Sequence, residues 1–131
     1  MSNAHPLLQE QIAITLQSYR EDKKQDHLAL RSQQSVQIVS FKDICYLQAD
    51  DCYTTVFLND GKKVVVSRSL KYYEELLPGN SFLRIHQSYV VNKIYVRRYH
   101  WKEGLLYLKD GTQLPVSVRK KELVGRFFKF W

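Results

Sequence analysis

The sequence predicts a mainly β fold, an antiparallel sheet architecture with two short α-helices, and three observations support it. Short runs that alternate apolar and polar residues recur from residue 36 onward, as expected of strands with one buried face. Asp-Gly pairs at residues 60–61 and 110–111 separate such runs, and this dipeptide favours the tight turns of β-hairpins. Two segments, near residues 70–77 and 118–130, instead repeat apolar residues at helical spacing.

The leading segment, residues 1–27, differs from the rest, and we interpret it as a linker that is helical or partly ordered. Ile12, Leu16 and Tyr19 have helical spacing within otherwise polar sequence. Residues 2–4, Ser-Asn-Ala, have the composition left by removal of an affinity tag, which indicates a piece of a longer protein. Residues 28–131 form the expected domain, because 131 residues suffice for one core and are too few for two of usual size.

About eight or more short strands are expected along this domain. The first four fall at residues 36–39, 44–47, 53–58 and 63–66, and Asn59-Asp60-Gly61 turns the chain between the last two. Residues 82–92 add strand and loop sequence. Lys102-Glu103-Gly104 then separates strands at residues 94–101 and 105–108, and a further strand follows at residues 113–116.

Two helices interrupt the strands. Ser69 can cap the first, which Pro78-Gly79 ends, and Ser117 can cap the second. The apolar faces expected to pack into the core are Leu70, Tyr73 and Leu77 in the first helix and Leu123, Phe127 and Phe130 in the second. Neither helix resembles the recognition helix of a helix-turn-helix protein.

The charge of the chain points to an anionic partner. The formal net charge is +7, and it is unevenly placed: residues 83–131 hold eleven Lys and Arg against three Asp and Glu, whereas residues 1–82 hold nine against ten. A basic field of this kind attracts nucleic acid or an anionic membrane surface, although a solvated basic face is the plainer alternative. The apolar runs are too short to span a membrane.

The sequence gives no sign of an enzyme, a metal site or a cofactor. Asp50-Asp51 is interpreted as a solvated turn, because no base or nucleophile accompanies it. The glycines form no phosphate-binding loop, and the histidines (His5, His27, His86 and His100) have no metal-ligand spacing. Cys45 and Cys52 suit a reducing cytoplasm, with Cys45 buried and Cys52 partly exposed.

Residues 82–92 combine apolar anchors with side chains suited to contacting nucleic acid. The polar members, which can hydrogen-bond to phosphates or base edges, are Arg84, His86, Gln87, Ser88 and Asn92. In the alternative interpretation they are loop and strand residues around one buried, satisfied histidine. Asn92 is assigned the structural task of tying the loop backbone together.

Several motifs, taken in order, give the chain a family resemblance. They are Asp-Ile-Cys-Tyr-Leu-Gln-Ala at 43–49, Cys-Tyr-Thr at 52–54, Ser-Leu at 69–70 with Leu-Leu-Pro at 76–78, residues 82–92, Asp-Gly at 110–111 and Leu-Pro-Val-Ser-Val-Arg at 114–119. Residues 28–128 thereby resemble a LytTR-type DNA-binding domain, the output domain of LytR/AlgR-type bacterial response regulators. The resemblance implies an elongated β fold that binds duplex DNA through loops entering neighbouring major grooves.

The resemblance also implies a set of site residues. Its base-reading positions fall on Tyr53, Gln87 and Arg119, and its backbone contacts fall near Arg68, Ser69 and Ser88. To the supporting set we add His86, which either contacts DNA or holds the loop. We also add the basic Lys120 and Lys121 at a helix start, where their charge opposes the helix dipole at a small cost that a nearby phosphate would offset. Gln87 departs from the arginine or asparagine that the family often carries.

The chemistry of the proposed readers agrees with these assignments. Arg119 can donate two hydrogen bonds to guanine O6 and N7, and Gln87 can pair with adenine N6 and N7. Tyr53 can present its hydroxyl to a phosphate or base, or can simply be packed. A second basic and aromatic cluster, residues 97–101, suits phosphate contact, base stacking, a buried strand face or a partner subunit.

The function predicted is sequence-specific binding of double-stranded DNA and regulation of transcription, as the output module of a two-component regulator in a bacterial cytoplasm. The expected partners are direct-repeat promoter sites and a second copy of the chain on DNA, without a membrane. A β-rich module for single-stranded nucleic acid or RNA is the alternative. Competition between duplex and single strand distinguishes the two, whereas salt dependence does not.

Overall fold

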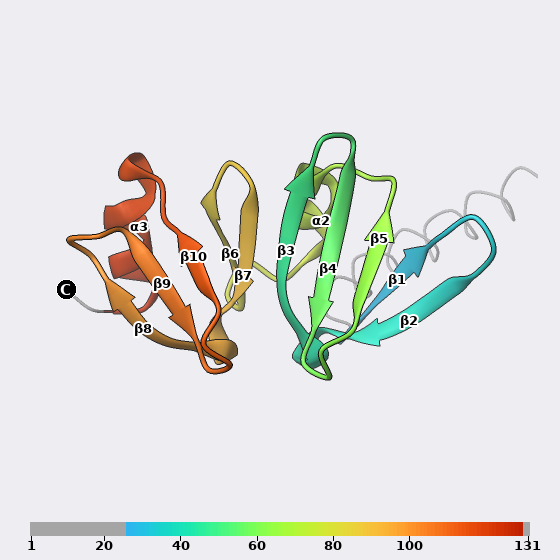
Figure 1. Ribbon diagram of the computed structural model, residues 1–131, viewed down its shortest axis with the longest axis horizontal. Helices are drawn as coiled ribbons and strands as arrows, with labels where there is room; N and C mark the ends of the chain where they lie inside the picture. The colour runs from blue at the N-terminus through green and yellow to red at the C-terminus, as the bar shows by residue number, and fades with distance from the viewer. Residues whose placement is uncertain (1–25, 130–131) are drawn as a thin grey trace, which may run out of the picture.

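The computed structural model describes residues 26–129, within which the chain forms ten strands and two α-helices (Figure 1). The strands are β1 His27–Arg31, β2 Val36–Ser40, β3 Ile44–Asp50, β4 Tyr53–Leu58, β5 Lys63–Val66, β6 Phe82–His86, β7 Tyr89–Asn92, β8 Val96–His100, β9 Leu105–Leu108 and β10 Gln113–Pro115. The helices are α2 Leu70–Leu76 and α3 Lys121–Phe127. The helical pattern predicted from Ile12, Leu16 and Tyr19 lies outside the described residues.

The strands pair antiparallel in three sheets that follow one another along the long axis of the molecule (Figure 1). The β1–β2 hairpin lies at one end, a five-stranded sheet of order β5-β4-β3-β7-β6 forms the middle, and a three-stranded sheet of order β10-β9-β8 lies at the other end. The predicted fold class, an elongated antiparallel β architecture with two short helices, is confirmed. β1 goes beyond the predicted strands, and its alternation buries Leu28 and Leu30.

Two hydrophobic cores hold these sheets together, and the β6–β7 hairpin belongs to both. Val90 packs into the first core, with β3, β4 and α2, whereas its neighbour Val91 packs into the second, with β9, β10 and α3. Successive side chains of a strand point to opposite faces, so one hairpin can serve as the wall between two cores. In β6, Phe82 and Ile85 divide in the same way between the first and the second core.

The two Asp-Gly hairpins form as predicted and share one geometry. Gly61 and Gly111 adopt φ of +86° and +92°, a region that glycine occupies without steric cost. In each turn the aspartate side chain accepts a hydrogen bond of 2.9 Å from the backbone N–H two residues later, Asp60 from Lys62 and Asp110 from Thr112. These local bonds explain why a dipeptide predicts the turn.

Helix α2 also matches its prediction. The Ser69 hydroxyl accepts a hydrogen bond of 3.2 Å from the backbone N–H of Tyr72, and the helix gives way to extended backbone at Leu77, just before Pro78. Leu70, Tyr73 and Leu77 are all buried.

The predicted start and buried face of the second helix are wrong. A 3-10 turn, Val118–Lys120, precedes α3, and the Ser117 side chain makes no capping hydrogen bond. The spacing of Leu123, Phe127 and Phe130 does not say which side of the helix faces the sheet, and the packing of α3 turns Val124 and Gly125 inward. Leu123 is 42% exposed, Phe127 is half-buried, and Phe130 lies outside the described residues.

The strand predicted at residues 94–101 begins later than expected, because a 3-10 turn precedes it. Asn92 opens a 3-10 turn, Lys93–Tyr95, by accepting a hydrogen bond of 3.3 Å from the Ile94 N–H. β8 therefore starts at Val96.

Candidate nucleic-acid interface

Strand direction brings the predicted site residues to one edge of the molecule. In the sheet order β5-β4-β3-β7-β6 with antiparallel neighbours, β3, β5 and β6 run in the same direction, so their carboxyl ends lie side by side. The segment after β10 reaches the same edge, at the top of Figure 1. We call this surface the loop edge and define it as residues 50–53, 67–69, 86–88 and 117–121, which include every site residue predicted from the sequence.

Three hydrogen bonds tie the four connections of the loop edge to one another. The Thr54 hydroxyl donates to the Arg68 carbonyl at 2.6 Å and joins the β3–β4 and β5–α2 connections. The backbone N–H of Ala49 donates to the Ser88 carbonyl at 2.8 Å, and that of Ser117 donates to the Ile85 carbonyl at 2.9 Å. The connections are therefore fixed relative to one another before any ligand binds.

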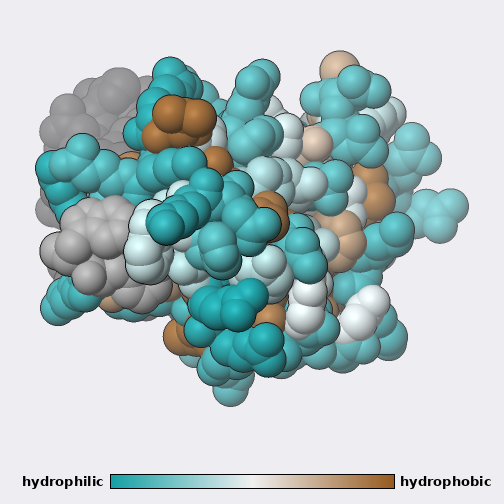
Figure 2. Space-filling model, turned by 60° about the vertical axis from the view of Figure 1, so that its left-hand side comes forward, coloured by the Kyte–Doolittle hydropathy of each residue, from teal (hydrophilic) through white to brown (hydrophobic). Residues whose placement is uncertain are grey.

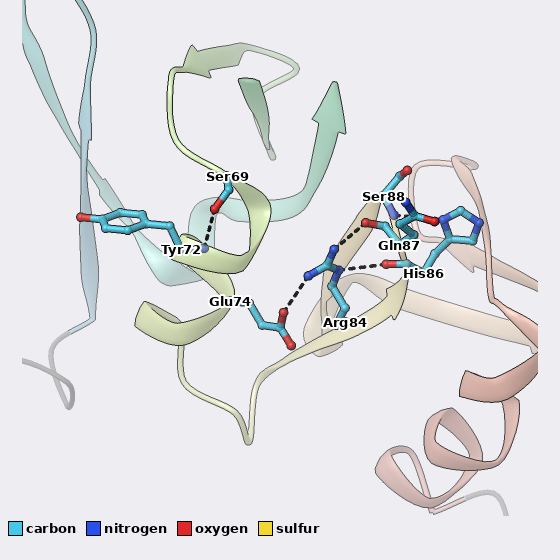
Figure 3. Close-up of polar contacts among 7 residues, drawn as sticks. All are labelled: Ser69, Tyr72, Glu74, Arg84, His86, Gln87 and Ser88. Carbon is cyan, nitrogen blue, oxygen red and sulfur yellow. Dashed lines mark hydrogen bonds and ion pairs between the residues drawn. The ribbon is translucent and has the colours of Figure 1, made fainter. Parts of the chain in front are cut away.

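Arg84 shapes the β6–β7 turn (Figure 3). Its guanidinium donates to the carbonyl of His86 at 3.0 Å and to that of Gln87 at 2.5 Å, and it pairs with the Glu74 carboxylate of α2 at 2.8 Å. With these groups engaged, Arg84 is a structural residue here, and the sequence-based suggestion that it contacts phosphate is not supported. Gln87 is exposed, with its backbone held and its side-chain amide at the surface.

His86 has a structural task in the same turn. Its Nδ1 accepts a hydrogen bond of 3.0 Å from the backbone N–H of Ser88. The neutral ring must therefore carry its proton on Nε2. The ring packs against Tyr89 with centroids 5.7 Å apart. These contacts support the loop-holding interpretation, and a DNA contact by His86 stays a prediction.

The β3–β4 and β5–α2 connections present an aromatic and a cationic side chain. Tyr53 opens β4 with 52% of its surface exposed, so it is not packed into the core. Arg68 is exposed, and its guanidinium lies 4.7 Å from the centre of the Tyr72 ring, a cation–π contact. Ser69 caps α2 through its side chain, as described above, and so supports the loop.

The connection between β10 and α3 carries three more basic residues of the loop edge. Arg119 is exposed, and Lys120 and Lys121 are half-buried. The backbone N–H of Lys120 donates to the Ser117 carbonyl at 2.9 Å, which closes the 3-10 turn. Figure 2 keeps the loop edge at the top and shows mainly hydrophilic residues there, with only isolated hydrophobic ones. This composition suits a charged, hydrated ligand.

Sequence reasoning missed the residues that hold the loop edge in shape. Thr54 and Glu74 make their contacts across elements, and a single sequence carries no signal for such pairs. Val118 was also passed over, although it is 83% exposed in the 3-10 turn beside Arg119. The available signal was that Val118 stands between Ser117 and Arg119 in the motif at residues 114–119.

The second basic and aromatic cluster, on β8, makes ordinary structural contacts. Tyr99 is buried, and the Arg98 guanidinium lies 4.4 Å from the centre of the Tyr107 ring. His100 lies 3.3 Å from a carboxylate oxygen of Glu103. Burial of Tyr99 within the strand agrees with the structural interpretation of this cluster, while Arg97 and Arg98 are both exposed at a register shift.

The described residues also bear on the expectations for metal ligands, membrane spans and cysteines. Residues 26–129 contain no group of three His, Cys, Asp or Glu side chains placed to hold a metal ion, and no helix among them is long and apolar enough to cross a membrane. Burial, together with the carboxylates of Asp110 and Asp60, raises the pKa of the Cys45 thiol to about 11. This thiol is thus protonated at neutral pH and a poor nucleophile. Cys52 is exposed, as predicted.

Comparisons with known proteins agree with this architecture. Residues 34–128 match the family described as LytTr DNA-binding domain. Sensory transduction protein LytT of Bacillus subtilis (strain 168) is 34% identical over 127 residues, covering 86% of this chain and 52% of that protein. Sensory transduction protein LytR of Staphylococcus epidermidis is 29% identical over 86 residues, covering 63% of this chain and 34% of that protein.

A solved structure shows the same fold. It is the LytTr DNA-binding domain of a putative methyl-accepting/DNA response regulator from Bacillus cereus, with a TM-score of 0.69 and 26% identity. The match covers 79% of this chain and 96% of that one. The chain spans about half the length of the LytT proteins that it matches.

Proposed function

Because the chain belongs to the LytTr DNA-binding domain family, we propose that its loop edge binds duplex DNA and recognises a specific base sequence. The observation that carries the proposal is that hydrogen bonds join the four connections of the loop edge. Tyr53, Gln87 and Arg119, which are far apart in the sequence, therefore lie on one edge of the molecule. A major groove is about 12 Å wide and admits protruding loops. A turn that joins two strands about 4.8 Å apart is narrow enough to enter one such groove.

Each proposed reader has a distinct chemical task. Arg119 donates two hydrogen bonds to guanine, and Gln87 pairs with adenine through its amide, which discriminate by about 1–3 kcal/mol each. Tyr53 contributes its hydroxyl to a base or phosphate. Arg68, Lys120 and Lys121 neutralise phosphates, which adds affinity without sequence preference.

Selection of bound duplexes from a random pool, followed by substitution of Arg119, tests this proposal. For Arg119→Ala we expect selectivity to disappear at one base position, because a bidentate contact is lost. Arg126→Ala is the matched control, since Arg126 is an exposed arginine of α3 paired with Glu122. A uniform loss of affinity across all sequences would instead make Arg119 a phosphate contact.

Competition tests the alternative of a single-stranded nucleic acid or RNA ligand. We expect the selected duplex to displace the bound probe at much lower concentration than either of its single strands or the matching RNA. Single-strand binding relies on several exposed aromatic rings on which successive bases stack, whereas Tyr53 is the one exposed aromatic side chain among the described residues of the loop edge, which supports the duplex. Better competition by the single strands would overturn the duplex proposal.

We further propose that the domain is the output module of a transcription regulator. The relatives named sensory transduction proteins are about twice as long as this chain, which leaves room for a signal-receiving part. Two copies of the domain on direct-repeat promoter sites would raise affinity through effective concentration. The test measures the number of protein copies bound, and their affinity, on duplexes that carry one or two copies of the selected sequence. An affinity per site that is the same on both duplexes would argue against cooperation between two copies of the domain.

A further inference from the structure

An open groove adjoins the loop edge on the side of the β1–β2 hairpin. It has a volume of about 970 Å³ and lies between this hairpin, the β4–β5 edge and the start of α2. Its polar and aromatic lining includes Arg31, Gln33, Gln34, Tyr53, Arg68 and Tyr72. Tyr53 and Arg68 belong to the loop edge as well, so the groove continues that surface.

The charge of the groove favours an anion. Arg31 and Arg68 both line it, and no Asp or Glu is among the described residues that line it. Two arginines in a lining without a carboxylate attract phosphate. The contact with Tyr72 holds the Arg68 guanidinium in place on one side.

The tip of the hairpin is closed by its own hydrogen bonds. The backbone N–H of Ser32 donates to the Ser35 carbonyl at 2.8 Å, and the Ser35 N–H donates to the Ser32 hydroxyl at 3.3 Å. Gln33 and Gln34 are thereby presented at the rim on a defined turn. Exposed Val36 and Val65 give the groove apolar surface, which suits the deoxyribose rings between phosphates.

We propose that this groove binds the sugar-phosphate backbone of the DNA beyond the base pairs that the loop edge reads. Arg31 and Arg68 contact phosphates, and the amides of Gln33 and Gln34 donate hydrogen bonds to the same strand. The inference rests on the proposed function, because it extends the duplex already placed on the loop edge. It adds the β1–β2 hairpin to the four connections of the loop edge as a fifth part of the interface.

Flank length provides the test. The selected site is prepared as a minimal duplex and as two longer ones, each extended by about one helical turn on one side. We expect one extension to tighten binding by the wild-type protein. Arg31→Gln should remove this gain and lower the salt-dependence slope on that duplex by about 0.9, the value for one phosphate contact, while binding to the minimal duplex is unchanged. Lys62→Gln, in the β4–β5 turn at the opposite edge, should leave all three duplexes unaffected.

The outcomes separate the two proposals. Failure of the wild-type protein to bind any duplex overturns the proposed function itself. Binding to all three with no gain from either extension, or with a gain that survives in Arg31→Gln, overturns the groove proposal alone. Circular dichroism of Arg31→Gln, an exposed position, verifies that the variant is folded.

A second inference comes from a different observation, the exposure of Val118. Its side chain is 83% exposed, more than that of any other large hydrophobic residue in the described part of the chain. It lies on the 3-10 turn that the Ser117 N–H anchors to Ile85, so its position is fixed beside Arg119. A fixed apolar group beside a base-reading cation suits the one apolar feature of the major groove, the thymine methyl group.

We infer that Val118 contacts the C5-methyl group of a thymine next to the base pair that Arg119 reads. Replacing each thymine of the selected site by deoxyuridine removes only that methyl group. At one position we expect the wild-type protein to lose about fourfold in affinity, the value for one buried methyl-sized group. Val118→Ala should be insensitive to the same replacement, whereas Arg119→Ala should remain sensitive.

This inference also rests on the proposed function and can fail separately from it. If the selected duplex binds but no thymine position distinguishes wild type from Val118→Ala, the methyl contact is wrong. If no duplex binds specifically, the proposed function fails first.

Discussion

Two regions of the molecule, β3-β4-β5-α2 and β8-β9-β10-α3, have the same plan. Each follows a 3-10 turn, Phe41–Asp43 or Lys93–Tyr95, and each has a register shift one residue into its first strand, at Cys45 or Arg97. Each then turns at an Asp-Gly pair, forms a third strand and ends in a seven-residue helix.

Backbone hydrogen bonds repeat in the same places. The N–H of Asn59 donates to the Asp43 carbonyl at 2.8 Å, and that of Lys109 donates to the Tyr95 carbonyl at 2.8 Å. In both regions, therefore, the Asp-Gly turn is anchored to the 3-10 turn that opens the region.

The two regions differ where the third strand meets the helix, at the loop edge. In the first region Ser69 caps α2 directly. In the second region a 3-10 turn intervenes, the Ser117 side chain makes no capping bond, and the basic Lys120 and Lys121 begin the helix. Cations near a helix start oppose the helix dipole. The helix start of the first region thus favours stability, and that of the second region, under the proposed function, favours phosphate binding.

Core substitutions give the largest expected effect and test whether the two regions fold together. Leu47 and Leu106 are fully buried, one in each core. Replacing either by alanine should lower the free energy of unfolding by about 3 kcal/mol. Both should shift a single urea transition, because the β6–β7 hairpin packs into both cores.

The exposed Val65→Ala is the control for these variants and should change stability by less than about 0.5 kcal/mol. Two transitions, each moved by only one of the core variants, would show that the regions unfold independently.

Removal of the Asn92 side chain comes next, because this buried amide joins the starts of both regions. It donates to the carbonyls of Phe41 at 3.1 Å and Ile44 at 2.8 Å, and it accepts from the Ile94 N–H. Asn92→Ala leaves these groups without partners and should cost about 2 kcal/mol, measured by urea denaturation. The control, Asn59→Ala at an exposed position, should lower the free energy of unfolding by less than about 0.5 kcal/mol. Equal losses for the two variants would show that the Asn92 side chain does not stabilise the junction of the two regions.

The sequence was sufficient for the hairpin turns and the helix start in which a side chain bonds to nearby backbone. The Asp-Gly turns and the capped α2 were predicted because Asp60, Asp110 and Ser69 each bond to backbone two or three residues away. The face of α3 differs from the prediction because spacing alone does not say which side of a helix meets the sheet, and the packing of α3 buries Val124 while Leu123 stays exposed.

The site could be predicted in part, for a comparable reason. The resemblance identified Tyr53, Gln87 and Arg119 as candidates, but their assembly on one edge depends on strand order, including the β3–β7 pairing between distant segments. The task of Arg84 depends on Glu74, ten residues away on another element. Local sequence patterns do not predict such contacts between distant segments.

Alanine substitution of the two serines compares the helix starts directly. Ser69→Ala should lower the free energy of unfolding by about 1 kcal/mol, because it removes a capping hydrogen bond. Ser117→Ala should change it by less than about 0.3 kcal/mol, since that side chain caps nothing. Urea denaturation of the two variants measures both values. Equal costs would mean that the two helix starts are equivalent in solution.

A charge reversal at the start of α3 is expected to raise stability slightly and to weaken DNA binding. Lys120→Asp places a negative charge at the start of α3 and should raise the free energy of unfolding by about 0.5 kcal/mol. The same substitution should weaken DNA binding and lower the salt-dependence slope by about 1, because a proposed phosphate contact is lost. Lys109→Asp makes the same charge change in the turn at the opposite edge and should leave DNA affinity nearly unchanged. If Lys120→Asp gains stability without losing affinity, the basic helix start lies outside the interface, and the difference between the two regions needs another cause.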